Sequence, residues 1–129
     1  MENWATGLII AGGVYDLGFA IFHLTFWKVF RWKEDLSKIS RLNSGIFQII
    51  NLCLTFIFLL MAYVSFFHIN DLATTGLGMA LLIGFALFWF LRMVEQIIFF
   101  GFKRRVSVMF TALFLLGCLI YVAAAVLLI

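Results

Sequence analysis

Four long apolar stretches dominate this sequence and restrict what it can fold into. They cover residues 4–27, 46–67, 76–102 and 106–129. Each is long enough to cross about 30 Å of hydrocarbon as a helix that rises about 1.5 Å per residue. Because 66% of the residues are hydrophobic, a water-soluble fold would expose large apolar patches. The sequence therefore predicts a single domain over residues 1–129, an all-α integral membrane protein with four transmembrane helices.

The connections between these stretches predict the topology. Most are short, which favours an up-and-down antiparallel bundle. Thr74 or Thr75 is expected to cap the third helix, and Asn43 or Ser44 the second. Eight of the nine Lys and Arg residues lie within 28–41 and 103–105, whereas the N-terminus and residues 68–71 carry none. The positive-inside rule then predicts cytoplasmic bases and both termini outside, as in a bacterial inner membrane or an equivalent one.

Charge also bears on partners and processing. The basic pI of about 9.1 arises from bases in the two cytoplasmic connections, so no nucleic-acid partner is expected. The opening residues, MENWATG, hold an acid and no base, which does not fit the basic start of a cleavable signal peptide. Within 28–42, Val29, Trp32, Leu36 and Ile39 recur every three or four residues. This spacing predicts a short amphipathic helix against anionic lipid head groups, although a solvated basic loop would have the same composition.

Three charged residues lie inside the predicted spans. A charge at the centre of a bilayer costs about 2.5–3.5 kcal/mol, so such residues usually face the bundle interior and find partners. Counting along helices from Lys28 and Lys103 places Asp16 about 18 Å and Arg92 about 16.5 Å above the basic rim. We therefore expect an Asp16–Arg92 ion pair near the midplane. A pair between Arg92 and Glu95 within one helix is the weaker arrangement, because its order opposes the helix dipole.

Further polar and aromatic residues fall on the same helix faces and in the same half of the membrane. The predicted site comprises an ion pair and proton site of Asp16, Arg92, Glu95 and His23, a polar lining of Gln48, Asn51, Thr55 and Gln96, and an aromatic lining of Trp27, Phe85 and Phe88. Two acids against one arginine leave one negative charge, which a low-dielectric site disfavours. We therefore expect the group as a whole to hold a proton.

Several chemistries have no residues to support them. His23 lies near the inner face of the membrane and His68 past the outer end of the second span, which excludes a bis-histidine haem. No Glu-x-x-His pair is present for a di-metal centre. Cys53 and Cys118 lie in apolar runs and read as small hydrophobic residues. We expect no metal and no cofactor, and an enzyme is disfavoured, although Glu95 and His23 could serve as acid and base.

Three functions fit these observations. The first is proton-linked transport or conduction of a small solute through the polar site. The alternatives are a non-catalytic accessory subunit of a larger membrane complex, and a protein that binds a lipid or quinone. Gly76, Ala80 and Gly84 form a face of small residues that favours close packing within one protomer or between the protomers of a homo-oligomer.

Overall fold

The computed structural model describes residues 2–129, without the side chain of Glu2. All the regular structure in this range is helical. The elements are α1 (Glu2–Leu24), α2 (Phe26–Val29), α3 (Trp32–Asp35), the 3-10 helix η1 (Leu36–Lys38), α4 (Arg41–Phe67), α5 (Ile69–Thr74), α6 (Gly76–Phe100) and α7 (Arg105–Leu128). Helices α1, α4, α6 and α7 are long and apolar enough to cross a membrane, which confirms that the four predicted stretches form long apolar helices; they are called spans below.

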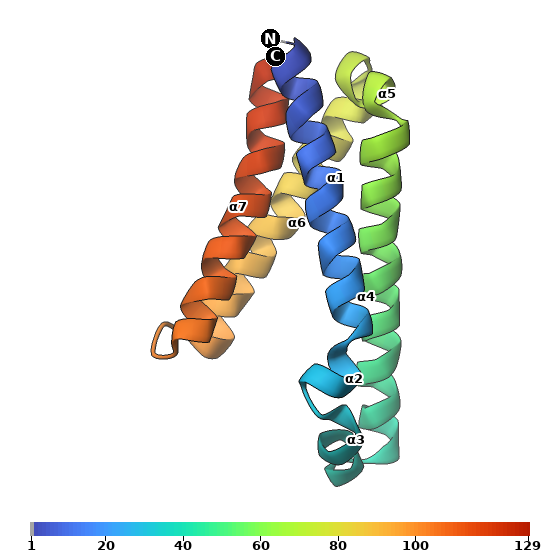
Figure 1. Ribbon diagram of the computed structural model, residues 1–129, viewed down its shortest axis with the longest axis vertical. Helices are drawn as coiled ribbons and strands as arrows, with labels where there is room; N and C mark the ends of the chain where they lie inside the picture. Colours follow the sequence, from blue (N-terminus) through green and yellow to red (C-terminus); the bar gives the residue numbers. More distant parts are fainter. Residues whose placement is uncertain (1) are drawn as a thin grey trace.

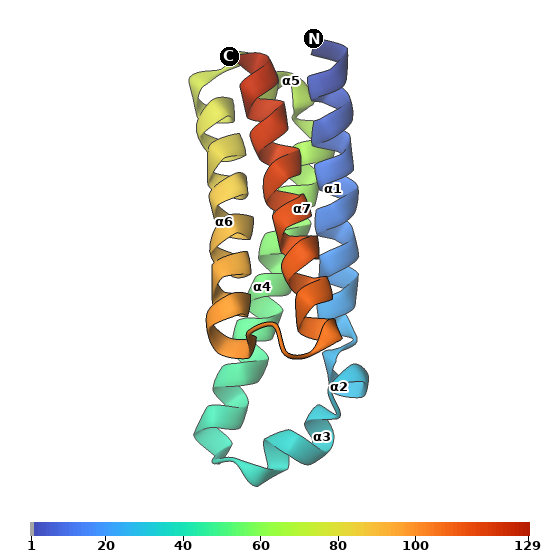
Figure 2. The same ribbon diagram turned by 90° about the vertical axis from the view of Figure 1, so that its left-hand side faces the viewer.

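The long helices lie side by side in one bundle (Figure 1). Both chain termini lie at one end, here called the terminal end, and α2, α3 and the α6–α7 connection lie toward the other, the loop end (Figure 2). Helix α1 packs along α4 and along α7, and α6 packs along α7. Toward the loop end, the α6–α7 pair separates from the α1–α4 pair (Figure 1). The bundle thus consists of two helix pairs that are closest near the terminal end.

Hydrogen bonds at the helix starts explain two of the boundaries. The Thr75 side chain accepts from the backbone N–H of Gly78 at 2.9 Å, which confirms the predicted cap of α6. Helix α4 is capped by Ser40, which accepts from the backbone N–H of Asn43 at 3.1 Å. Neither Asn43 nor Ser44 serves as the cap, so this span begins at Arg41 and not near residue 46.

The segment between the first two spans is not a single helix. Arg31 adopts a left-handed conformation with φ of 54°, and it separates α2 from α3. Ion pairs here have a spacing of three residues, with 2.9 Å between Arg31 and Glu34 and 4.0 Å between Lys38 and Asp35. The single amphipathic helix predicted within residues 28–42 is not formed, because the chain turns at Arg31 and continues as the 3-10 helix η1 after Asp35.

Aromatic rings fill the centre of the bundle. Trp89 on α6 is fully buried and stacks between Phe58 of α4 and Phe114 of α7, with ring centroids 5.2 and 5.9 Å away. Tyr15 of α1 meets the same indole edge-on at 4.8 Å. Such offset and edge-to-face pairs add to the free energy gained by burial. Each of the four spans therefore contributes a ring to one cluster.

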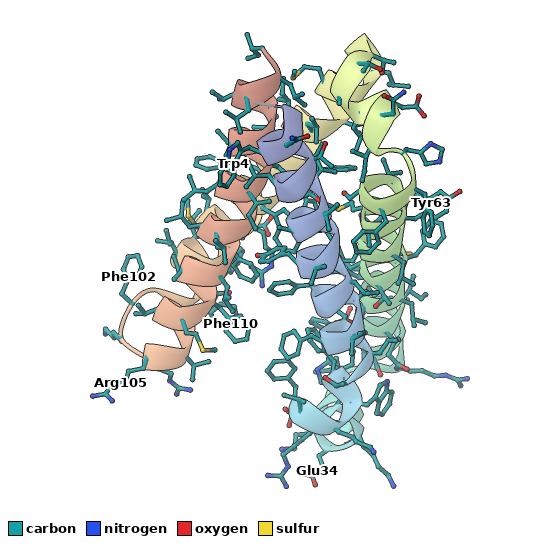
Figure 3. The ribbon with its side chains drawn as sticks, turned by 45° about the horizontal axis from the view of Figure 1, so that its top comes forward. Trp4, Glu34, Tyr63, Phe102, Arg105 and Phe110 are labelled. Carbon is teal, nitrogen blue, oxygen red and sulfur yellow. The ribbon has the colours of Figure 1, made fainter. Side chains whose placement is uncertain are left out.

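The outer surface is apolar, as a surface in contact with lipid requires. Large side chains such as Tyr63 and Phe102 project away from the bundle (Figure 3). The small-residue face of α6 also points outward: Ala80 is exposed, and a Cβ added at Gly76 or Gly84 would meet nothing within 4 Å. This face is therefore not used for packing within the described part of the chain.

Candidate functional site

Asp16 lies in the middle of α1 and is completely buried. Its carboxylate accepts two hydrogen bonds from other spans. The indole N–H of Trp89 on α6 donates to Oδ1 at 3.1 Å, and the hydroxyl of Tyr121 on α7 donates to Oδ2. The carboxyl group is therefore fixed by two donors that are neither cations nor backbone groups.

A fourth residue extends this arrangement to the remaining span. The hydroxyl of Ser65 on α4 lies 2.9 Å from the Tyr121 hydroxyl, and either one can donate. Ser65, Trp89 and Tyr121 are all fully buried. The four side chains Asp16, Ser65, Trp89 and Tyr121, one from each span, are called the Asp16 hub below.

Two glycines leave room for the tyrosines around the hub. A Cβ at Gly12, one turn before Asp16, would lie 2.5 Å from a ring carbon of Tyr121. A Cβ at Gly117 would lie 2.6 Å from the ring of Tyr15, whose hydroxyl donates to the backbone carbonyl of Leu113 at 2.6 Å. Close approach of α1 and α7 thus depends on the absence of side chains at Gly12 and Gly117.

The expected ion pair between Asp16 and Arg92 is not present. Within the described residues, a carboxylate comes within 4.0 Å of a lysine, arginine or histidine nitrogen only at Arg31–Glu34, Lys38–Asp35 and His68–Asp71, all outside the hub. The residue of α6 that reaches Asp16 is Trp89, three positions before Arg92 and about 4.5 Å farther from the loop end. Counting residues from Lys28 misjudged the level, because α1 ends at Leu24 and the chain then turns.

Arg92 binds an aromatic ring instead of a carboxylate. Its guanidinium carbon lies 4.4 Å from the centroid of Phe114, within the range of a cation–π interaction. Because Phe114 also stacks on Trp89, this ring lies between the arginine and the hub. Glu95, one turn farther along α6, is exposed and has no hydrogen bond within the described residues.

The other predicted polar residues form separate pairs and not one layer. His23 Nδ1 lies 2.8 Å from Asn51 Oδ1, and the Asn51 amide donates to the His23 carbonyl at 3.0 Å. Thr55 donates back to the Asn51 carbonyl at 2.8 Å, one turn along α4. Gln96 donates to Ser107 of α7 at 3.1 Å. Asn51 and Gln96 therefore join helices within each pair, α1 to α4 and α6 to α7.

The remaining lining residues differ in their surroundings. Gln48 donates to the carbonyl and hydroxyl of Ser44, both at 3.2 Å, and so bonds only within its own helix. Phe85 meets Tyr121 edge-on at 5.3 Å, and Phe88 meets Trp89 at 5.1 Å, so both line the hub. Trp27 lies on α2, is 45% exposed, and contacts Trp32 and not the site.

Sequence reasoning missed three of the four hub residues. Counting positions along α7 alone puts Tyr121 too far from Asp16 for the two to pair. A helical side chain leans toward the N-terminus of its helix, and the N-terminus of α7 lies at the loop end. The phenol therefore reaches back along α7 to the level of Asp16. That lean, applied to each polar residue in the spans, is the signal that would have paired Tyr121 with Asp16.

Comparison of the chain with protein-family models, curated proteins and solved structures finds no match.

Proposed function

We propose that this protein is a proton-linked transporter or channel for a small solute, with Asp16 as the group that binds the proton. The observation that carries the proposal is a carboxyl group buried among all four spans, with no cation of the described residues within 4.0 Å. An ionised carboxylate in a medium of low dielectric is costly, and an ionisable residue inside a membrane is a common element of proton relays.

The hub accommodates both states of this carboxyl group. When Asp16 is ionised, Ser65 donates to the Tyr121 oxygen and Tyr121 donates to Oδ2. When a proton binds Oδ2, the new O–H donates to the Tyr121 oxygen, and Tyr121 donates to Ser65. Trp89 donates to Oδ1 in both states. Proton binding therefore reverses two hydrogen bonds, and the oxygens of Asp16, Tyr121 and Ser65 each keep a partner.

The position of the hub links proton binding to helix movement. It joins the α1–α4 pair to the α6–α7 pair, and these pairs separate toward the loop end (Figure 1). A change in the hydrogen bonds between the two helix pairs can favour one relative tilt of the pairs over another. Coupled transport requires such an equilibrium between two conformations.

We further propose that the loop end faces the cytoplasm of a bacterial inner membrane or its equivalent, with both termini outside and the spans antiparallel. Eight of the nine Lys and Arg residues lie within 28–41 and 103–105, toward the loop end, and this distribution supports the orientation. The α2–α3 segment would then lie at the membrane interface, where its bases meet anionic lipid head groups.

A structural role as an accessory subunit is the second candidate. It is favoured by one observation: within the described residues, every buried side-chain nitrogen and oxygen has a hydrogen-bond partner. A fully satisfied polar cluster fixes helix packing without any proton movement.

The two candidates predict different electrical behaviour. Purified protein in proteoliposomes on a solid-supported membrane is subjected to a rapid pH jump. Proton binding at a site inside the membrane field displaces charge, so the wild type is expected to give a transient current even without a solute. Asp16→Asn should fold, because its amide donates to Tyr121 as the protonated acid would, but it should give no current.

Asp71→Asn is the matched control, since Asp71 is an exposed acid on α5, and its current should equal that of the wild type. A wild type that gives no current, or an Asp16→Asn current of undiminished size, refutes proton binding at Asp16 and leaves the structural role.

A further inference from the structure

Arg92 is a second charged group in the spans, and the hub does not use it. It is half-buried on α6, where the ring of Phe114 supports one face of its guanidinium at 4.4 Å. No hydrogen bond from its side chain and no carboxylate partner occur within the described residues. Since every buried side-chain nitrogen there has a partner, the unpaired N–H groups of Arg92 lie at the protein surface.

The depth of this arginine makes its lack of a partner significant. Helix α6 continues for eight residues beyond it to Phe100, about 12 Å toward the loop end. A bare guanidinium that far inside a membrane is costly, so such groups bind an anion, a carbonyl or water. Arginine presents a planar edge of N–H donors that matches the two oxygens of a carboxylate or phosphate.

The surroundings restrict what the anion can be. Phe114 stacks on Phe110 at 6.0 Å, and Phe110 stacks on Phe22 of α1 at 5.7 Å, so apolar rings continue from the arginine toward α1. Glu95, one turn nearer the loop end, repels a second negative charge. The basic residues 103–105 at the same end attract anions toward the site.

We propose that Arg92 binds the oxyanion of an amphipathic molecule with no more than one net negative charge, whose apolar part lies against these phenylalanine rings. The oxyanion is a carboxylate or a phosphate, from a free solute or from a lipid head group. In naming the class of solute, this inference rests on the proposed transport function, but binding at Arg92 requires no proton transfer at Asp16.

Trp89 provides the reporter, because it stacks on the ring that supports Arg92. The substitutions Trp4→Phe, Trp27→Phe and Trp32→Phe remove the other tryptophans, none of which touches the hub. The protein is purified in dodecyl maltoside, which carries no oxyanion, and is titrated with benzoate. In a second arm, phosphatidylglycerol is added to the micelles and no benzoate is present.

We expect a saturable change in Trp89 fluorescence. A benzoate response identifies a free solute as the source of the oxyanion, and a response to phosphatidylglycerol alone identifies a lipid head group. Arg92→Gln should raise the dissociation constant at least about tenfold, as expected for the loss of charge-assisted hydrogen bonds. The dissociation constant of Arg92→Lys should lie between those of the wild type and Arg92→Gln, because lysine keeps the charge but not the planar donor edge.

Arg41→Gln is the matched control, since Arg41 is an exposed arginine at the start of α4, outside the 103–105 cluster, and its dissociation constant should equal that of the wild type. The proposal is overturned if the wild type responds to neither probe, or if Arg92→Gln and Arg92→Lys bind as well as the wild type. Because the pH-jump current reports on Asp16 alone, failure of oxyanion binding is distinguishable from failure of proton binding.

Discussion

Replacing Tyr121 by phenylalanine removes the centre of the hub while leaving the ring in place. The lost hydroxyl donates to Asp16 and lies 2.9 Å from Ser65, so two contacts between spans disappear. Hydrogen bonds between membrane helices contribute on average about 0.6 and at most about 1.7 kcal/mol each. Two of them give a loss of about 1.2 to 3.4 kcal/mol in the free energy of unfolding. The upper half of this range is expected, because the acceptor is a completely buried carboxyl group.

Unfolding by sodium dodecyl sulfate in mixed micelles, followed by circular dichroism, measures this free energy. Tyr63→Phe is the control, since Tyr63 is 52% exposed on α4 and its hydroxyl has no hydrogen-bond partner in the described residues. The free energy of unfolding of Tyr63→Phe should equal that of the wild type. A loss for Tyr121→Phe below about 0.5 kcal/mol, or one no larger than that of Tyr63→Phe, would refute the claim that the hub holds the spans together.

Two further substitutions test the packing around the hub and the second contact between α1 and α4. Gly12→Ala places a Cβ 2.5 Å from the Tyr121 ring and should cost about 1–3 kcal/mol in the same unfolding assay. Gly18→Ala lies on the same helix, where an added Cβ meets nothing within 4 Å, and should not lower the free energy of unfolding. Equal losses for the two variants would count against the close approach of Gly12 to the Tyr121 ring. Asn51→Leu removes both hydrogen bonds to His23 and should cost about 1–3 kcal/mol, whereas an unchanged free energy would show that this pair adds no stability.

Some features of this protein follow from sequence and others do not, for identifiable reasons. The four spans are evident because a bilayer requires long apolar helices, and the cap at Thr75 follows from local hydrogen bonding. Asp16 stands out because an acid is rare inside a span. Its partners depend on helix rotation and on how far side chains reach, so Trp89 and Tyr121 could not be selected by counting residues along the helices.

Counting residues along the helices also explains why the predicted polar layer is not found in the structure. Residue counts placed Gln96, Asn51 and His23 in the same half of the membrane, which suggested one shared site. The structure divides them between two helix pairs, with Asn51 bonded to His23 and Gln96 bonded to Ser107. Depth alone does not decide which helices are neighbours at the loop end, where α4 and α6 separate (Figure 1).

The central claim is that Asp16 exchanges a proton while the bundle stays folded. Infrared spectroscopy of the protein in lipid, recorded across a pH series, observes the carboxylic acid C=O band directly. Proton exchange at Asp16 should give a band that is absent from Asp16→Asn and that disappears reversibly in the wild type as pH rises. A band that remains constant at every pH at which the protein is folded, or no band that depends on Asp16, would contradict it.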